Sequence, residues 1–469
     1  MGIVTKVVII GGGPGGYEAA LVGRQLGGEV TLIEREGMGG AAVLTDCVPS
    51  KTLIATSEVL VRIENARQLG LRVEGGVDSI SVDHAAVNKR ILALARAQSE
   101  DIADRLRAEG ITILRGSGRL DGRRRVIAEL ETGEEQVLEA DIILLATGTT
   151  PRELPEAPND GERILNWKQL YDLDEHPGEL IVVGSGVTGV EFASAYHALG
   201  CEVKLVSSRK QVLPGQDSDA AAALERAFKR RGMDIVGESR AQGARREGDR
   251  VVVTLSDGRE LTGTHALFAV GATPNTQNLG LEEAGVTTTE SGHIPVDRVS
   301  RTNIPGVYAA GDVTGVFPLA SVAAMQGRIA MYHALGDAVT PLDIQQVSSN
   351  VFTSPEVATV GITQEEADTG AVNVASVMIS MASNARSKMQ NFEDGFVKLF
   401  CLPTTGIIVG GVIVAPRASE LIHAVTLAVS QRITVDQFSQ AFTVYPSMSG
   451  SVAEAARRLH RRDDDYLTS

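Results

Sequence analysis

The sequence predicts an α/β protein that contains two Rossmann-type dinucleotide-binding folds. Two observations support this prediction. A short apolar strand pattern, a glycine-rich turn and a helical pattern follow one another near the start of the chain, and the same succession returns near residue 184. An apolar strand pattern that ends in Thr147-Gly148 also has a later counterpart, which ends at Gly271. With 469 residues the chain is long enough for several domains.

The first motif begins with a β-branched run at Val4–Ile10, followed by a glycine turn, a helix expected at Tyr17–Leu26 and a strand expected at Glu29–Ile33. The first glycine permits a tight turn, the second lets the backbone approach a pyrophosphate, and the third allows close helix–strand packing. Glu34 follows the second strand, where a carboxylate accepts hydrogen bonds from ribose hydroxyls. The turn contains Gly11, Gly13, Pro14 and Gly16.

The second motif repeats this order. Strands are expected at Leu180–Val183 and Glu202–Val206, with a helix at Val190–Leu199 between them. Two dinucleotide folds in one chain imply two nucleotides, or one nucleotide and one flavin dinucleotide. A long helical pattern from Asp83 to Glu109 lies between the two motifs. The second turn contains Gly184, Gly186 and Gly189.

Further motifs lie between and after these folds. The stretch Gly39–Thr52 contains Cys-Val-Pro-Ser-Lys, ending at Lys51, and Thr302–Asp312 ends in Ala-Ala-Gly-Asp. Together and in this order, the motifs resemble the pyridine nucleotide-disulfide oxidoreductases, flavoenzymes that carry Cys-x-x-x-x-Cys before Pro-Ser-Lys. The resemblance covers about Val4 to Gly327, and Val351–Ala358 is similar to the opening of the family's interface domain.

The resemblance implies FAD on the first fold, a nicotinamide nucleotide on the second, and homodimers formed through a carboxyl-terminal domain. The expected fold class is α/β, with two Rossmann-type dinucleotide-binding domains plus a C-terminal α+β dimerisation domain. The expected FAD-binding domain has two parts, at 1–150 and 273–344, and the NAD(P)H-binding domain lies between them at 151–272. The interface domain is expected at 345–469.

The resemblance also implies site residues. In the family, the lysine after Pro-Ser, here Lys51, approaches the flavin N5 region and pairs with the glutamate after the second turn, here Glu191. A positive charge there stabilises an anionic reduced flavin; a structural ion pair between domains is a second interpretation, and both can hold. The residues expected to bind FAD are Gly11, Gly13, Pro14, Gly16, Glu34, Lys51, Gly116, Thr147, Gly148, Asp312 and Ala320. The residues expected to bind NAD(P)H are Gly184, Gly186, Gly189, Glu191, Ser207, Arg209, Lys210 and Gly271.

The end of the second strand in the nicotinamide fold indicates which nucleotide binds. Enzymes that use NAD carry an acid there for the ribose 2′-hydroxyl. Here Ser207 and Ser208 are followed by Arg209 and Lys210. Hydroxyls and cations favour a 2′-phosphate, which a carboxylate would repel. The sequence therefore favours NADPH and leaves NADH open; the alternative interpretation is an ordinary basic surface turn.

Three groups of the family's disulfide-reducing unit are absent. Ala42 occupies the first cysteine position, and the family's His-Pro-Thr-x-Ser-Glu is here Tyr445-Pro-Ser-Met-Ser-Gly450. Tyr445 replaces the histidine base, and tyrosine is a poor base at neutral pH. We therefore expect no lipoamide dehydrogenase activity. Electrons must leave the flavin directly, so the chain is similar to the NAD(P)H:quinone oxidoreductases of this family, with a quinone as acceptor.

The remaining cysteine of the motif, Cys47, has two interpretations. It is either a single catalytic thiol that cycles through sulfenic acid, as in a flavin peroxidase or oxidase, or a residual packing residue beside the flavin. We favour packing, because no histidine or resolving cysteine is recognisable nearby to lower its pKa. A non-enzymatic flavoprotein subunit is the third alternative, against which the retained Lys51 and Glu191 argue. Cys201 and Cys401 are expected in the core.

Composition limits the partners. The net charge of −15 argues against nucleic acid and anionic membranes, both of which need surplus Lys and Arg. Three cysteines are too few for a disulfide framework or a zinc site and indicate a reducing, cytoplasmic setting. Met1–Lys6 has no charged leader pattern, and Gly406–Val414 is too short to span a bilayer. We expect no metal and no stable membrane insertion.

Overall fold

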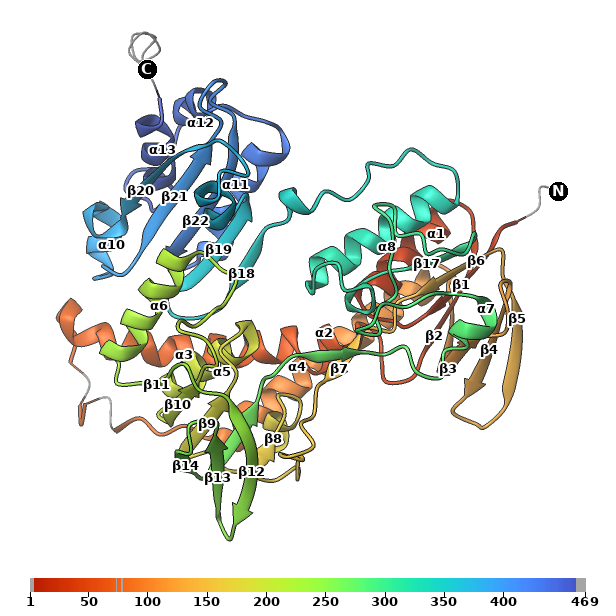
Figure 1. Cartoon of the computed structure of the whole chain (residues 1–469), viewed down its shortest axis with the longest axis horizontal. Coiled ribbons are helices and arrows are strands. Elements are labelled where there is room, and N and C mark those ends of the chain that lie inside the picture. Colours follow the sequence, from red (N-terminus) through yellow and green to blue (C-terminus); the bar gives the residue numbers. More distant parts are fainter. Residues whose placement is uncertain (1–3, 73, 77–78, 461–469) are drawn as a thin grey trace.

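The computed structural model describes residues 4–72, 74–76 and 79–460. In these residues, three larger sheets occupy separate regions of the molecule, and two small antiparallel sheets accompany them. Figure 1 shows the first large sheet on the right, the second at the lower left and the third at the upper left.

The first sheet is the expected Rossmann fold with an antiparallel extension. Side chains along its first strand point alternately to the two faces of the sheet. Val7 and Ile9 pack towards helices α1 (Pro14–Gln25) and α8 (Ala320–Ala334), while Val8 and Ile10 pack into the apolar cluster on the other face. Burial on both faces explains the continuous apolar run. The strand order is β17 (Val307–Ala309), β6 (Ile142–Leu145), β1 (Lys6–Ile10), β2 (Glu29–Glu34), β3 (Thr112–Leu120), β4 (Arg125–Leu130) and β5 (Glu135–Glu139).

The strands from β17 to β3 are parallel, and the sheet continues through two antiparallel pairings, β4 with β3 and β5 with β4. β17 and α8 belong to this fold although they follow the second sheet in the chain. The first fold is therefore completed by a later segment, as the family resemblance implies.

The second sheet is wholly parallel and packs against α5 (Val187–Ala198) and α6 (Ser218–Arg230). A three-stranded antiparallel sheet extends from it. The parallel strand order is β11 (Asp234–Val236), β10 (Glu202–Val206), β9 (Glu179–Val183), β15 (His265–Phe268) and β8 (Ile164–Leu165). The antiparallel strands are β12 (Ala241–Glu247), β13 (Arg250–Leu255) and β14 (Glu260–Gly263).

Two chain crossings connect the first and second sheets. β7 (Thr149–Pro151) and β16 (Ala272–Pro274) pair antiparallel where the chain leaves the first fold and returns to it. Just before β7, Thr147 Oγ1 donates a hydrogen bond to the carbonyl of Asn275 at 2.8 Å, and Asn275 Nδ2 donates to the carbonyl of Thr147 at 2.9 Å. These two hydrogen bonds therefore connect the two crossing segments beside the end of β6.

The third sheet is antiparallel and carries helices on one side of its core. The strand order is β18 (Ser349–Val351), β19 (Glu356–Gly361), β22 (Ile408–Ala415), β21 (Phe396–Cys401) and β20 (Ala375–Ser380). The helices that close its core are α11 (Ala418–Ser430), α12 (Val435–Gln440) and α13 (Ser449–Arg458).

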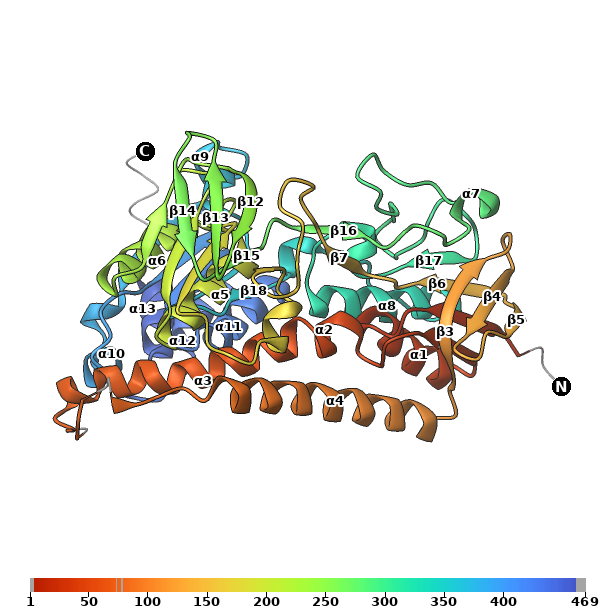
Figure 2. The ribbon, with the colours of Figure 1, turned by 90° about the horizontal axis from the view of Figure 1, so that it is seen from below.

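Helices α2 (Gly40–Leu44), α3 (Cys47–Ala66) and α4 (His84–Ala108) link the three regions. Figure 2 shows α3 and α4 side by side along one edge of the molecule. Leu53 and Ile54 of α3 lie in the same apolar core as the second sheet and α5. The remaining short helices are η1 (Arg67–Leu69), η3 (Gln169–Asp172), α7 (Leu281–Ala284), η4 (Asp312–Thr314), η5 (Ile344–Gln346), α9 (Gln364–Asp368), η6 (Met381–Ser383) and α10 (Ala385–Met389).

The predicted fold class is confirmed, with one difference in detail. α1 begins at Pro14 rather than Tyr17, and α5 begins at Val187 rather than Val190, because the last residues of each glycine turn already adopt helical geometry. The exact residues at which the domains meet stay a prediction. Among residues 4–72, 74–76 and 79–460, every helix is too short or too polar to cross a bilayer.

Candidate active site

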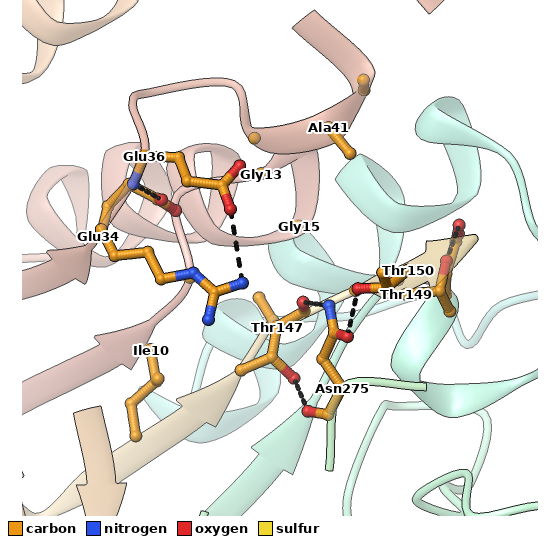
Figure 3. A pocket seen from close by; sticks show the side chains of 18 of the residues that line it. Ile10, Gly13, Gly15, Glu34, Glu36, Ala41, Thr147, Thr149, Thr150 and Asn275 are labelled. Atoms are coloured by element: carbon orange, nitrogen blue, oxygen red, sulfur yellow. Dashed lines mark hydrogen bonds and ion pairs between the residues drawn. The ribbon is translucent and has the colours of Figure 1, made fainter. Parts of the chain in front are cut away.

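A cavity of about 510 Å³ opens in the first fold, at the carboxyl ends of its parallel strands. The turn after β1, the end of β2, helix α2, the start of α3 and the segments beside β7 and β17 surround it. Figure 3 shows Glu34 on one side of this cavity and Thr147, Thr149 and Asn275 on another. Of the residues predicted to bind FAD, the lining includes Gly11, Gly13, Pro14, Glu34, Gly116, Thr147, Gly148, Asp312 and Ala320.

The three turn glycines of the first motif have different surroundings. At Gly11, with φ of 104°, a Cβ would lie 2.2 Å from the carbonyl oxygen of Ala146. At Gly16 a Cβ would lie 1.8 Å from the carbonyl oxygen of Gly11, so Gly16 belongs to the packing behind the cavity. At Gly13 a Cβ would meet nothing within 4 Å. The middle glycine therefore leaves open space in front of the amino terminus of α1, as a bound pyrophosphate requires.

The second glycine turn has the same geometry. A Cβ at Gly184 would lie 2.2 Å from the carbonyl oxygen of Ala269, and one at Gly189 would lie 1.8 Å from the carbonyl oxygen of Gly184. Gly186 again has nothing within 4 Å of its Cβ position. The two motifs thus form equivalent cradles, each with open space before a helix amino terminus.

Polar groups at both ends of the cavity fit a flavin dinucleotide. Glu34 Oε2 accepts a hydrogen bond from Gly12 N at 2.6 Å and Oε1 accepts from Glu36 N at 2.7 Å, which fixes the carboxylate at the cavity edge. Asp312 lies at the start of η4, and Thr149 Oγ1 donates to its carboxylate at 3.5 Å. Burial raises the pKa of Asp312, although the hydrogen bond from Thr149 opposes this shift.

Lys51 and Glu191 form a buried joint beside the cavity rather than in its lining. Lys51 Nζ on α3 lies 2.8 Å from Glu191 Oε2 on α5. Glu191 is 3% exposed, and its Oε1 accepts a hydrogen bond from Phe352 N at 2.8 Å, just after β18. Lys51 Nζ also lies 5.0 Å from the ring centroid of Phe352. The joint therefore connects all three regions of the chain.

The charge of Lys51 is stabilised at this joint. Burial alone would lower the pKa of Lys51, but the carboxylate of Glu191 outweighs that effect, and the pKa is raised overall. Lys51 therefore remains an ammonium at neutral pH, one helical turn after the cavity residue Cys47.

Cys47 lines the cavity at the first position of α3. Burial raises the pKa of its thiol to about 12, the neighbouring Asp46 carboxylate adds to this shift, and Lys51 opposes it only in part. A thiol with such a pKa is protonated at neutral pH and is a poor nucleophile. Cys201 and Cys401 are buried, as predicted, and no disulfide joins any of the three cysteines, all of which lie in the described residues.

In the nicotinamide loop, the side chain of Ser207 is bonded within the protein. Ser207 is 1% exposed, and its hydroxyl lies 2.8 Å from the hydroxyl of Ser185 and donates to the carbonyl of Arg209 at 3.0 Å. These hydrogen bonds close the turn, and the role of Ser207 in nucleotide binding stays a prediction. Arg209 and Lys210 are exposed, and their side chains form no ion pair within the described parts of the chain. Gly271, with φ of 99°, follows β15 on the way to β16.

Tyr445 does not join the other predicted catalytic residues within one chain. It lies in the loop between α12 and α13, is 86% exposed and is absent from the cavity lining.

Sequence reasoning missed many residues of the cavity lining, among them Asp46, Trp167, Lys168 and Asn275. Asp46 could have been found, because it is the one acid between Gly39 and Thr52. Trp167 and Lys168 come from the second region, and no motif marks them.

Comparisons with known proteins agree with this geometry. Residues 5–327 match the family described as pyridine nucleotide-disulphide oxidoreductase, and residues 347–456 match its dimerisation domain. A Mycobacterium tuberculosis protein named NAD(P)H dehydrogenase (quinone) is 49% identical over 98% of this chain and 95% of its own length. A dihydrolipoyl dehydrogenase of Chlamydia trachomatis is 35% identical over 96% of this chain and 95% of its own length.

Solved structures give the same result. The crystal structure of LpdA from Mycobacterium tuberculosis has a TM-score of 0.93 and 49% identity, covering 98% of this chain and 100% of that one. The flavoprotein disulfide reductase RclA of Escherichia coli, at 23% identity, has a TM-score of 0.85 over 97% of this chain and 99% of that one, and so shows the shared fold. The chain therefore belongs to the pyridine nucleotide-disulphide oxidoreductase family, whose members use FAD and a nicotinamide nucleotide.

Proposed function

We propose that this chain is an FAD-dependent NAD(P)H:quinone oxidoreductase that works without a disulfide relay and without lipoamide dehydrogenase activity. One observation carries the proposal. Ala42 and Cys47 both line the cavity, so the place of the family's disulfide holds one methyl group and one thiol. The Lys51–Glu191 joint and both glycine cradles remain. The chain thus keeps the parts that load electrons and lacks the part that passes them to a disulfide.

Each retained part has a role in this proposal. The turn around Gly13 and the amino terminus of α1 hold the pyrophosphate of FAD, Glu34 binds its ribose, and Asp312 binds its ribityl chain. When bound, FAD accepts a hydride from the nicotinamide nucleotide and delivers two electrons to the acceptor. Lys51 adds a fixed positive charge that stabilises negative charge on the reduced cofactor, and Glu191 holds Lys51 in place.

The nucleotide is proposed to be NADPH, with NADH as a second substrate. Arg209 and Lys210 are exposed cations beside the second cradle, and neither is neutralised by a described neighbour. Lysine and arginine side chains bind phosphates through charge-assisted hydrogen bonds, so the pair suits a 2′-phosphate.

We propose that the protein acts as a homodimer. Phe442, Val444 and Tyr445, all before α13, are largely exposed in the single chain. Exposed apolar side chains grouped in this way are typical of an interface. The match to the family's dimerisation domain supports the same conclusion. Three cysteines without a disulfide among the described residues favour a reducing, cytoplasmic setting.

Steady-state oxidation of NADPH and NADH by the purified holoenzyme tests the function. We expect turnover with benzoquinone and naphthoquinone acceptors, and none above background with lipoamide. Turnover with lipoamide comparable to that with quinones would contradict the proposal. Absence of turnover with every acceptor would favour the non-enzymatic subunit.

The peroxidase alternative has its own test. It requires a reactive thiolate at Cys47, whereas burial raises the pKa of that thiol to about 12. Peroxide-dependent oxidation of NADPH that disappears in Cys47→Ala would support the alternative.

A further inference from the structure

Asp46 has a carboxyl group in the cavity, and none of the binding roles described above involves this residue. It is the last residue before α3, in the short connection from α2, and it lines the cavity together with Cys47. The side chain is partly accessible, so a molecule in the cavity can reach it.

The fold does not use the carboxylate of Asp46. An acid at this position commonly caps the following helix, but here the side chain makes no capping hydrogen bond. Only its backbone takes part: the carbonyl accepts from Ser50 N at 2.8 Å, and the N–H donates to the carbonyl of Ala41 at 2.8 Å. Within the described residues, no side chain or backbone group is hydrogen-bonded to the carboxylate. A carboxyl group in a cavity without a structural partner is available for chemistry.

The charges around Asp46 hold its pKa near neutrality. Burial raises the pKa of Asp46 to about 6; Lys51 opposes this shift, the carboxylates of Glu191 and Asp312 add to it, and Lys168 opposes it. These groups come from α3, α5, η4 and the segment before η3. Both the acid and the carboxylate are therefore populated near neutral pH, which suits a group that gives up a proton and regains it in each cycle.

The other candidate donors in this region are unsuited to that role. Cys47 has a pKa raised to about 12 and holds its proton too tightly. The pKa of Lys51 is raised as well, and its ammonium is fixed to Glu191. Tyr445 is exposed outside the cavity. Asp312 already accepts a hydrogen bond from Thr149.

We propose that Asp46 is the proton donor in quinone reduction, an inference that rests on the proposed function. Reduction of a quinone to a hydroquinone takes two electrons and two protons. When bound, reduced FAD would supply both electrons and one proton as a hydride equivalent. The carboxyl of Asp46 gives the second proton to a quinone oxygen, its O–H bond breaks as the new O–H bond forms, and solvent then reprotonates the carboxylate.

The test compares acceptors that differ in their need for protons. Enzyme reduced beforehand is mixed with a benzoquinone or with ferricyanide, which takes one electron and no proton. For Asp46→Asn we expect the rate with benzoquinone to fall roughly a hundredfold, the scale of a lost general acid, while the rate with ferricyanide stays within about twofold. Asp46→Glu should restore part of the quinone rate. Asp101→Asn, on the exposed surface of α4, is the matched control.

The sign of the pH dependence follows from the role of donor. The acid form must be present, so the wild-type quinone rate should fall as pH rises through about 6, and Asp46→Asn should lose this inflection. A second measurement needs no turnover: the infrared carbonyl band of a protonated carboxyl should titrate near pH 6 in the wild type and be missing in Asp46→Asn.

The outcomes separate the two proposals. If the wild type reduces quinones and Asp46→Asn reduces them equally fast, the proton-donor role is wrong and the proposed function stands. Equal losses with benzoquinone and ferricyanide would assign Asp46 a structural role and overturn the inference. A wild type that reduces ferricyanide but no quinone overturns both.

Discussion

Lys51 Nζ lies 2.8 Å from Glu191 Oε2, although 140 residues separate the two in the chain. The pair joins the helix that carries Cys47 to the helix that follows the second glycine turn. Because Glu191 also accepts a hydrogen bond from Phe352 N at 2.8 Å, the pair contacts all three regions of the chain. The ion pair is thus a structural joint, and it holds the ammonium of Lys51 beside the cavity.

Substitutions that neutralise Lys51 and Glu191 distinguish the structural role of the ion pair from a role of its charge in catalysis. Lys51→Met leaves the buried carboxylate of Glu191 without its cation, and we expect the free energy of unfolding to fall by about 2 kcal/mol. Lys51→Met combined with Glu191→Gln removes both charges, so most of the stability should return. If the charge of Lys51 acts in catalysis, the rate of flavin reduction by NADPH should be roughly a hundredfold lower in both variants than in the wild type.

Chemical denaturation and stopped-flow absorbance measure the two effects. Recovery of both stability and rate in the double variant would leave only the structural role. Arg107→Met, which breaks an exposed pair with Asp104 on α4, is the control and should change stability by less than about 1 kcal/mol.

The thiol of Cys47 is predicted to be dispensable. Its pKa of about 12 leaves roughly one molecule in 10⁵ as thiolate at pH 7, so neither redox cycling nor alkylation should be fast. Cys47→Ala should retain FAD and most of the quinone reductase activity. Loss of turnover by about a hundredfold would instead support a thiol-based mechanism. Alkylation by iodoacetamide, followed by mass spectrometry at several pH values, checks the thiol independently.

Nucleotide choice is predicted to depend on two exposed cations. Arg209→Ala with Lys210→Ala should raise the KM for NADPH about tenfold or more, because charge-assisted hydrogen bonds to the 2′-phosphate are lost, and should change the KM for NADH little. Arg123→Ala with Arg124→Ala removes an equal charge from the exposed turn between β3 and β4 and serves as the control. Equal effects on both nucleotides would show that the pair does not contact the phosphate.

Most of the fold could be predicted because short segments of the sequence determine its strands and turns. The run Val7–Ile10 and the turn at Gly11 specify strand and turn through burial and a positive φ. The side-chain environment of Ser207 could not be predicted, since it depends on Ser185 and on the path of the loop after β10. A sequence pattern shows which residue types follow a strand, and packing decides which way each side chain points.

The site was predicted in part for the same reason. Gly11, Gly13 and Pro14 of the first glycine turn line the cavity as their spacing requires, because the backbone alone positions them. Trp167 and Lys168 reach the cavity only because β7 and β16 hold the second region beside it. Asp46 is adjacent to a recognised cysteine, but its pKa near 6 depends first on burial and then on charges from four separate segments, which no single stretch of sequence reveals.

Restoring one cysteine is predicted not to restore a disulfide reductase. Ala42 and Cys47 both line the cavity, and the family's spacing between the two positions is unchanged, so we expect Ala42→Cys to form a bridge with Cys47. The bridge would still lack a base. Tyr445 is exposed outside the cavity, and Gly450, near the start of α13, has no side chain that could orient a replacement.

Catalytic groups that act as a unit are strongly non-additive, so one restored member should recover little of the rate. Ala42→Cys with Tyr445→His and Gly450→Glu is the smallest change from which we expect measurable lipoamide reduction. Quinone reduction should persist in the single and triple variants, because electrons can still leave the flavin directly. Lipoamide-dependent oxidation of NADH and NADPH is the measurement, with thiol titration to establish that the bridge has formed. Substantial lipoamide turnover by the wild type, or by Ala42→Cys alone, would contradict both this prediction and the assignment of a quinone acceptor.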